Sequence, residues 1–173
     1  MLGTFSALPN SLEESLSCLA SRCEEFDWAV NLQSGPFRQL HFTDPDDSRN
    51  LLDLFYDFPI QAPQAYFRRG VLPKHANDLV FDEWSYYFGF DASSISAEEL
   101  HQQLGDDILP GEKVFELLKN TESMFLIHVD DGWWELFSAN RQILECWKNC
   151  WNGRDVESSR WVDGNVNYPF PFD

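Results

Sequence analysis

Two apolar runs joined by Asp131-Gly132 constrain the fold of this chain more than any other stretch. The runs are MFLIHV, which begins at Met124, and WWELFS, which begins at Trp133. Aspartate followed by glycine between two apolar runs is the strongest short-range signal of a β-hairpin, because both residues tolerate the backbone angles of a tight turn. The sequence therefore predicts an antiparallel hairpin, and the fold must contain a sheet.

The register of this hairpin follows from the length of its loop. With a two-residue loop, Asp130 lies opposite Trp133 and His128 lies opposite Glu135. Side chains alternate between the two faces of a strand. The predicted core face holds Phe125, Ile127, Val129, Trp134 and Leu136. The other face is mixed and holds Leu126, His128, Asp130, Trp133, Glu135 and Phe137. A helix, the C-terminal tail or a partner protein then covers Trp133.

Helix signals recur along the chain. Ser11 with Glu14, and Ser96 with Glu99, form capping boxes, which satisfy the free amides of a helix's first turn. The expected helices are residues 11–26, 43–58, 96–104, 112–120 and 139–151, and the expected strands are 27–33, 37–42, 79–90, 124–129 and 133–138. Residues 79–90 also allow a helix. We predict a single α+β domain over residues 1–173, with an antiparallel or mixed sheet and helices packed mainly on one side.

Acidic residues dominate the charge of the chain. Twenty-nine Asp and Glu face twelve Lys and Arg, which gives a formal net charge of −17 and a pI near 4.4. Such a surface repels phosphate backbones and anionic lipid, so we expect neither nucleic acid nor a membrane as partner. A basic protein is the natural partner, because opposite potentials speed association and fix orientation. Solubility alone is the competing explanation.

Four cysteines are present, at positions 18, 23, 146 and 150. The segment Met1–Pro9 lacks the basic residues and long apolar run of a secretion signal, so we expect a cytoplasmic protein with reduced thiols. The spacings Cys-x4-Cys and Cys-x3-Cys on expected helices are poor zinc signatures, and the sequence predicts no metal site and no cofactor. Buried, inert thiols are the expectation.

No sequence motif of catalysis is present. The chain contains no P-loop, GxGxxG, GxSxG or HExxH pattern, and its four histidines do not form ligand spacings. No cysteine lies in a glycine-rich or basic context that favours a thiolate nucleophile. We therefore expect a protein that is not an enzyme, with a small enzyme of unknown reaction as an alternative.

Acidic and aromatic residues are interleaved in two places. In the hairpin, Trp133 lies on one face with Asp130 and Glu135, and aromatic side chains act as anchors in protein interfaces. Asp82-Glu83-Trp84, followed by YYF, repeats the arrangement. The predicted partner-binding residues are Asp130, Asp131, Trp133 and Glu135, with Asp82, Glu83 and Trp84 as second choice. Ordinary packing of these aromatic residues is the alternative.

The hairpin–helix unit FLIHVDDGWWELFS–ANRQILECW, in a small acidic chain rich in Trp and Tyr, resembles bacterial immunity proteins of polymorphic-toxin and contact-dependent inhibition systems. The unit covers about a fifth of the chain. The resemblance implies a protein that binds a cognate toxin domain, often a basic nuclease, and neutralises it by stoichiometric protein–protein inhibition. An acidic secretion chaperone or another non-enzymatic adaptor is the alternative. A DNA mimic would carry regular rows of carboxylates, which the sequence does not show.

Overall fold

The computed structural model describes residues 2–7, 9, 11–32, 64–74, 76, 85–105, 108, 110–129, 133–151 and 159–162, and for some of these, Trp133 among them, the backbone alone. The described helices are α1 (Leu12–Cys18), α2 (Ala20–Cys23), α4 (Val71–Lys74), α5 (Ala97–Leu104), α6 (Glu112–Asn120) and α7 (Arg141–Cys150). The described strands are β1 (Leu2–Ala7), β2 (Asp27–Leu32), β3 (Gln64–Phe67), β4 (Ser85–Phe90), β5 (Ser123–Val129), β6 (Trp133–Ser138) and β7 (Ser159–Val162).

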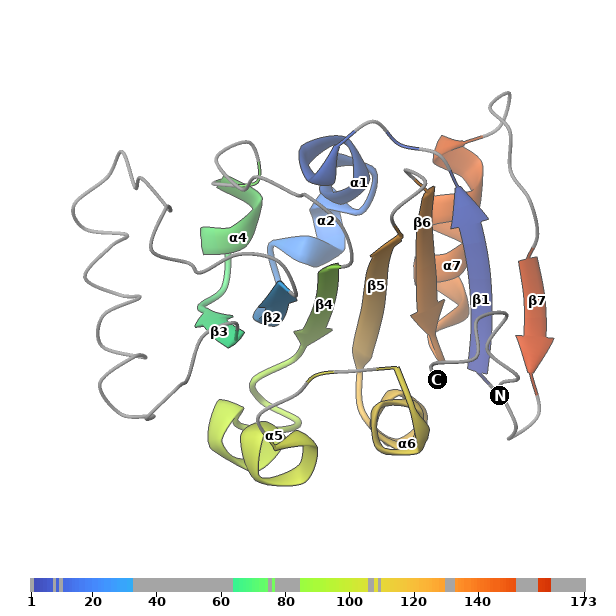
Figure 1. Ribbon diagram of the computed structural model, residues 1–173. Coiled ribbons are helices and arrows are strands. Elements are labelled where there is room, and N and C mark those ends of the chain that lie inside the picture. The colour runs from blue at the N-terminus through green and yellow to red at the C-terminus, as the bar shows by residue number, and fades with distance from the viewer. Residues whose placement is uncertain are drawn as a thin grey trace.

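The described strands form one antiparallel sheet in the order β3-β2-β4-β5-β6-β1-β7 (Figure 1). The hairpin β5–β6 lies near the middle, and β1 pairs with β6 on one side and β7 on the other. The sheet and its helices confirm the predicted α+β class. The predicted strand 37–42 and helix 43–58 lie outside the described residues.

Both faces of the central strands are buried, and each face has its own core. One face holds Trp28, Tyr87, Leu126 and Trp134, which pack against side chains of α1, α4 and α7. The other face is covered by α5 and α6 and includes Tyr86, Phe88, Phe125, Ile127 and Phe137. Figure 1 shows α5 and α6 at the bottom of the view, α1 at the top, and α7 behind β6 and β1. More helices lie on the first face, as predicted, but the second face is also covered.

The hairpin is present, but its register differs from the prediction by one residue. Val129 pairs with Trp133 and His128 with Trp134, so three residues rather than two connect the strands. Trp134 consequently lies on the face of Leu126, whereas Ile127 shares its face with Glu135. The predicted pair of His128 and Glu135 is wrong. The His128 ring instead lies against the Trp134 ring, with centroids 4.6 Å apart.

Two of the cysteines expected to be reduced are joined. Cys18, the last residue of α1, forms a disulfide with Cys150, the last residue of α7, across a sequence separation of 132 residues. The bond forms because α1 and α7 pack side by side on the same face of the sheet, a proximity that the spacing of cysteines in the sequence could not reveal. Cys146 is a free thiol.

Candidate partner-binding surface

One of the predicted contact residues, Glu135, is buried. It is only 3% exposed, so the prediction that it lies on the surface is wrong. The one-residue change of register places it opposite Ile127, on the sheet face that α6 covers. Of Trp133 only the backbone is described, and the remaining predicted contact residues lie outside the described residues: Asp82, Glu83, Trp84, Asp130 and Asp131. The structure therefore leaves the tip of the hairpin as a prediction.

Helix α5 is fixed at its start by a complete capping box. The Ser96 hydroxyl accepts a hydrogen bond from the Glu99 backbone N–H at 3.2 Å, and a Glu99 carboxylate oxygen accepts one from the Ser96 backbone N–H at 2.9 Å. The Glu99 carboxylate also accepts a hydrogen bond from the Ser96 hydroxyl at 3.0 Å, and the two bonds that it accepts from Ser96, the backbone one first, hold the pKa of Glu99 below its usual range. Glu99 is therefore ionised at neutral pH, at the start of the helix, where negative charge is favoured.

The loop before α5 is ordered in the same way. The Asp91 carboxylate accepts hydrogen bonds from the Ser93 hydroxyl at 2.6 Å and the Ser93 backbone N–H at 2.9 Å, and these bonds lower the pKa of Asp91. Asp91 also lies 3.7 Å from the Arg69 guanidinium. Since an Asx turn and a capping box follow one another, the entry to α5 is held by local contacts.

Replacing Ser96 with alanine tests this entry. The variant loses the acceptor for the Glu99 amide, and we expect the free energy of unfolding to fall by about 1 kcal/mol in urea denaturation. The deficit should narrow as the pH falls through the lowered pKa of Glu99, because protonation weakens the bond from the Ser96 hydroxyl to the Glu99 carboxylate, which the wild type has and the Ala variant lacks. Ser96→Thr keeps the cap and serves as the control. A Thr variant as unstable as the Ala variant would show that the capping bond is not responsible.

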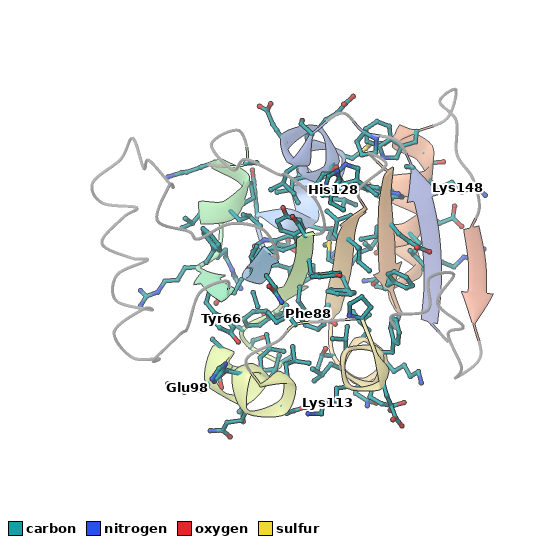
Figure 2. All side chains as sticks on the ribbon, in the orientation of Figure 1. Tyr66, Phe88, Glu98, Lys113, His128 and Lys148 are labelled. Atoms are coloured by element: carbon teal, nitrogen blue, oxygen red, sulfur yellow. A yellow bond between two sulfur atoms is a disulfide. The ribbon has the colours of Figure 1, made fainter. Side chains whose placement is uncertain are left out.

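Helix α6 is amphipathic. Val114, Phe115, Leu117 and Leu118 are buried against the sheet, and Phe115 packs on Phe137 with ring centroids 5.4 Å apart. The outward positions carry charged or polar side chains, namely Glu112, Lys113, Glu116 and Asn120. Figure 2 shows Glu98 of α5 and Lys113 of α6 on the side of these helices that faces away from the sheet.

An open groove of about 570 Å³ runs between α5 and α6. Its lining includes two largely buried apolar side chains, Ile95 and Leu117, which form an apolar base. Three carboxylates, those of Glu99, Glu112 and Glu116, line it together with the Lys113 ammonium. We name this feature the α5–α6 groove. Its chemistry is an apolar base with predominantly negative charge around it.

Two of these carboxylates already have partners, and that of Glu99 is held by Ser96 in the capping box. Glu116 accepts a hydrogen bond from Lys119 at 2.8 Å, one turn further along α6. Such an exposed pair on a helix contributes only a few tenths of a kcal/mol. A Lys or Arg of a partner that makes further contacts can therefore displace Lys119 from Glu116. The groove therefore retains the capacity to bind an external Lys or Arg.

A second polar cluster lies under α5. The Tyr66 hydroxyl lies 3.4 Å from His101 Nδ1. Asn31 and Tyr86 pair across β2 and β4, and within the described part neither the Asn31 side-chain oxygen nor the Tyr86 hydroxyl makes a hydrogen bond. Burial raises the pKa of Tyr86 to about 12, so its phenol stays neutral at physiological pH. A neutral buried phenol is not a base or a nucleophile.

Other site classes find no support in the described residues. Among them, no group of three or more His, Cys, Asp or Glu side chains is placed to hold a metal ion. Likewise, no helix in the described part is long and apolar enough to cross a membrane. Comparisons with protein-family models, with curated proteins and with solved structures gave no match.

Sequence reasoning missed the α5–α6 groove, although both helices were predicted. The outward residues of α5 and α6 read as ordinary solvated faces, because nothing in the sequence shows that the two helices cover the same sheet face. The run of aromatic residues in β4 is typical of a strand covered on both faces, so it signals helices on this side of the sheet but does not reveal the groove between them.

Proposed function

We propose that this protein is an immunity protein, which binds a cognate toxin domain and neutralises it by stoichiometric inhibition. The observation that carries the proposal is the α5–α6 groove, with its apolar base and three carboxylates, on a chain of formal net charge −17. The class of partner follows from this chemistry, and the assignment to immunity proteins rests on the resemblance of the hairpin–helix unit at residues 125–147.

A basic side chain matches the groove in both of its parts. Lys and Arg carry a long apolar stem and a charged head, so the stem can pack on Ile95 and Leu117 while the head pairs with a carboxylate. Hydrogen bonds between an ionised guanidinium and a carboxylate are about twice as strong as neutral ones. The groove therefore fits a segment of a basic protein better than it fits a neutral ligand.

The overall negative charge of the chain should also raise the rate of association with a basic partner. A strongly acidic protein attracts a basic domain over distances comparable to the Debye length, and steering of this kind raises association rates by one to three orders of magnitude. An inhibitor must bind its toxin before the toxin acts, so fast association serves the proposed function. Toxins with a basic nuclease domain are the natural targets, because a nuclease carries positive charge for its own substrate.

We place the proposed action in the cytoplasm, where a toxin would act either before its export from the producing cell or after its entry into a target cell. The experiment that tests the function is co-expression of this protein with the toxin domain encoded beside it. We expect rescue of growth and a 1:1 complex in size-exclusion chromatography. A toxin domain that remains lethal and fails to bind would refute the immunity proposal.

Charge reversal in the groove tests the contact surface separately. The variant Glu112→Lys with Glu116→Lys should weaken toxin binding at least tenfold in surface plasmon resonance, since two attractive contacts become repulsive. The matched control is Glu13→Lys with Glu24→Lys. It makes the same change in net charge at exposed positions of α1 and beyond α2, and Glu13, like Glu112, lies in the first turn of its helix.

The control separates local contact from long-range steering. Both double variants have the same net charge, so a loss caused only by weaker steering would be equal in the two. We expect the control variant to lose less than threefold in affinity. Equal affinities would show that the partner does not bind at the α5–α6 groove, while growth rescue by the wild type would still support the inhibitory function.

A further inference from the structure

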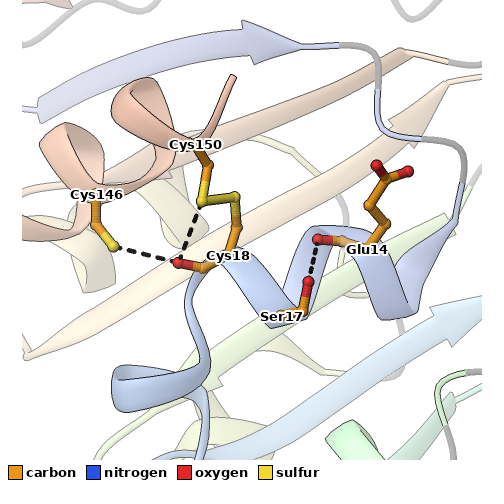
Figure 3. Close-up of a disulfide and its surroundings, with 5 residues drawn as sticks. All are labelled: Glu14, Ser17, Cys18, Cys146 and Cys150. Atoms are coloured by element: carbon orange, nitrogen blue, oxygen red, sulfur yellow. Dashed lines mark hydrogen bonds between the residues drawn. A yellow bond between two sulfur atoms is a disulfide. The ribbon is translucent and has the colours of Figure 1, made fainter. Parts of the chain in front are cut away.

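Three cysteine sulfur atoms gather where the end of α1 meets α7. The free Cys146 thiol donates a hydrogen bond to the Cys18 carbonyl oxygen at 3.2 Å (Figure 3). The Cys150 sulfur lies 3.7 Å from the same oxygen. This contact is not a hydrogen bond, because Cys150 is in the disulfide with Cys18 and has no thiol proton to donate. Two sulfurs of α7 therefore flank one residue of α1.

Helix geometry explains why both sulfurs face Cys18. Residues four apart on a helix lie one above the other on the same face, and Cys146 and Cys150 have this spacing in α7. The Cα atoms of Cys18 and Cys150 are 5.9 Å apart, which is the usual separation for a disulfide. Cys18 is thus presented to two consecutive turns of α7.

The three residues are also open to reagents in solution. Cys150 is exposed, and Cys18 and Cys146 are half-buried. Thiol–disulfide exchange requires that an attacking thiolate reach a disulfide sulfur, so accessibility and proximity together decide where it occurs. Fully buried thiols, the expectation from the sequence, would not exchange.

We propose that Cys18, Cys146 and Cys150 form a thiol–disulfide exchange site, in which Cys18 alternates between Cys150 and Cys146. The Cys146 thiolate attacks the Cys18 sulfur and forms a new S–S bond. The bond between Cys18 and Cys150 breaks, and the Cys150 sulfur leaves with its electron pair. Cys150 then takes up the proton that Cys146 lost, so no outside oxidant or reductant is consumed.

The exchange changes which part of α7 is tied to α1. In the described state the tie is at Cys150, the last residue of the helix, next to the buried Trp151. In the alternative state the tie moves back by one turn, and Cys150 becomes an exposed thiol. In that state an external disulfide can react with the free Cys150 thiol at the end of α7. The described state has no free thiol at this position.

Tryptic digestion separates the four cysteines cleanly. Cleavage after Arg22 and Arg38 places Cys18 in residues 1–22 and Cys23 in residues 23–38, and cleavage at Arg141, Lys148 and Arg154 places Cys146 in residues 142–148 and Cys150 in residues 149–154. The purified full chain is equilibrated at pH 8, quenched by acid, alkylated and digested. We expect mass spectrometry to find peptide 1–22 linked to 149–154 in one population and to 142–148 in another.

Two single variants make the test decisive. Cys150→Ala, exposed to oxidised glutathione as the disulfide reagent, should form the bond between Cys18 and Cys146, and Cys146→Ala should keep the bond between Cys18 and Cys150. Circular dichroism verifies that both variants are folded. Failure of peptide 1–22 to link to 142–148 in both the wild type and folded Cys150→Ala would overturn the proposal, because Cys146 would then be unable to reach Cys18.

Discussion

Replacing Cys18 with alanine is expected to lower the free energy of unfolding by about 3–5 kcal/mol. The Cys18–Cys150 disulfide closes a very long loop, with a sequence separation of 132 residues. A cross-link of this length removes much of the freedom of the unfolded chain, and loop-closure entropy gives a stabilisation of this size. Urea denaturation of the oxidised wild type and the variant measures the difference.

Two comparisons isolate the disulfide from the loss of the side chain. Reductant should destabilise the wild type by a similar amount and leave Cys18→Ala unchanged, because that variant lacks the cross-link. Cys150→Ala should be more stable than Cys18→Ala under oxidising conditions if Cys146 takes over the bond. A reductant effect of the same size in Cys18→Ala would mean that another pair of cysteines carries the stabilisation.

Replacing Trp28 with alanine should cost about 3–5 kcal/mol in the free energy of unfolding. Trp28 is fully buried in β2, opposite Gly89 of β4. A Cβ atom at position 89 would lie 3.0 Å from two ring carbons of Trp28 and 3.2 Å from the Met124 side chain. The indole therefore packs directly over the glycine, and its removal leaves a large cavity between the sheet and its helices.

A double-mutant cycle with Gly89→Val tests this close approach. The added side chain overpacks the site, and we expect a cost of about 1–3 kcal/mol when Trp28 is present. In the Trp28→Ala background, valine enters the space that the indole occupied, so the two costs should not add. Trp147→Ala, on α7 over β1 and β6, is the control background and should give additive costs. Additivity with Trp28→Ala as well would contradict the packing described here.

The helices on the second sheet face could be predicted from local signals alone. The capping box at Ser96 and Glu99 and the apolar spacing of α6 both lie within single short segments, and the structure confirms them. The α5–α6 groove could not be predicted, because it depends on both helices covering one sheet face. That arrangement is a property of the tertiary fold and leaves no mark in either segment.

The hairpin could be predicted only in part from its local sequence. Its position was predicted correctly, but the chain uses three connecting residues, and one extra residue changes the face on which each side chain of a strand lies. Glu135 is buried because α6 covers the sheet face on which it lies. The Glu135 carboxylate was expected on a solvent-exposed face of the sheet. The prediction failed because helices cover both faces of the sheet at this strand.

Strands β1 and β7 were missed for a related reason. Leu2–Ala7 and Ser159–Val162 are short, and their sequences, LGTFSA and SRWV, lack a clear alternation of apolar and polar residues. They become strands by tertiary pairing, in which β1 pairs with β6 and β7 pairs with β1, each far away in the sequence from β1. Tertiary pairing of this kind overrides weak local propensity.

The position of β1 inside the sheet has a consequence for synthesis on the ribosome. The chain emerges with β1 first, but the two strands that pair with it, β6 and β7, emerge after every other described strand. Until then β5, with its apolar run, is an open edge, and open apolar edges attract other chains. The nascent protein therefore cannot complete its sheet gradually. Strand β1 finds its place in the sheet only after β6 has emerged, and the growing chain is most vulnerable to aggregation just before that moment.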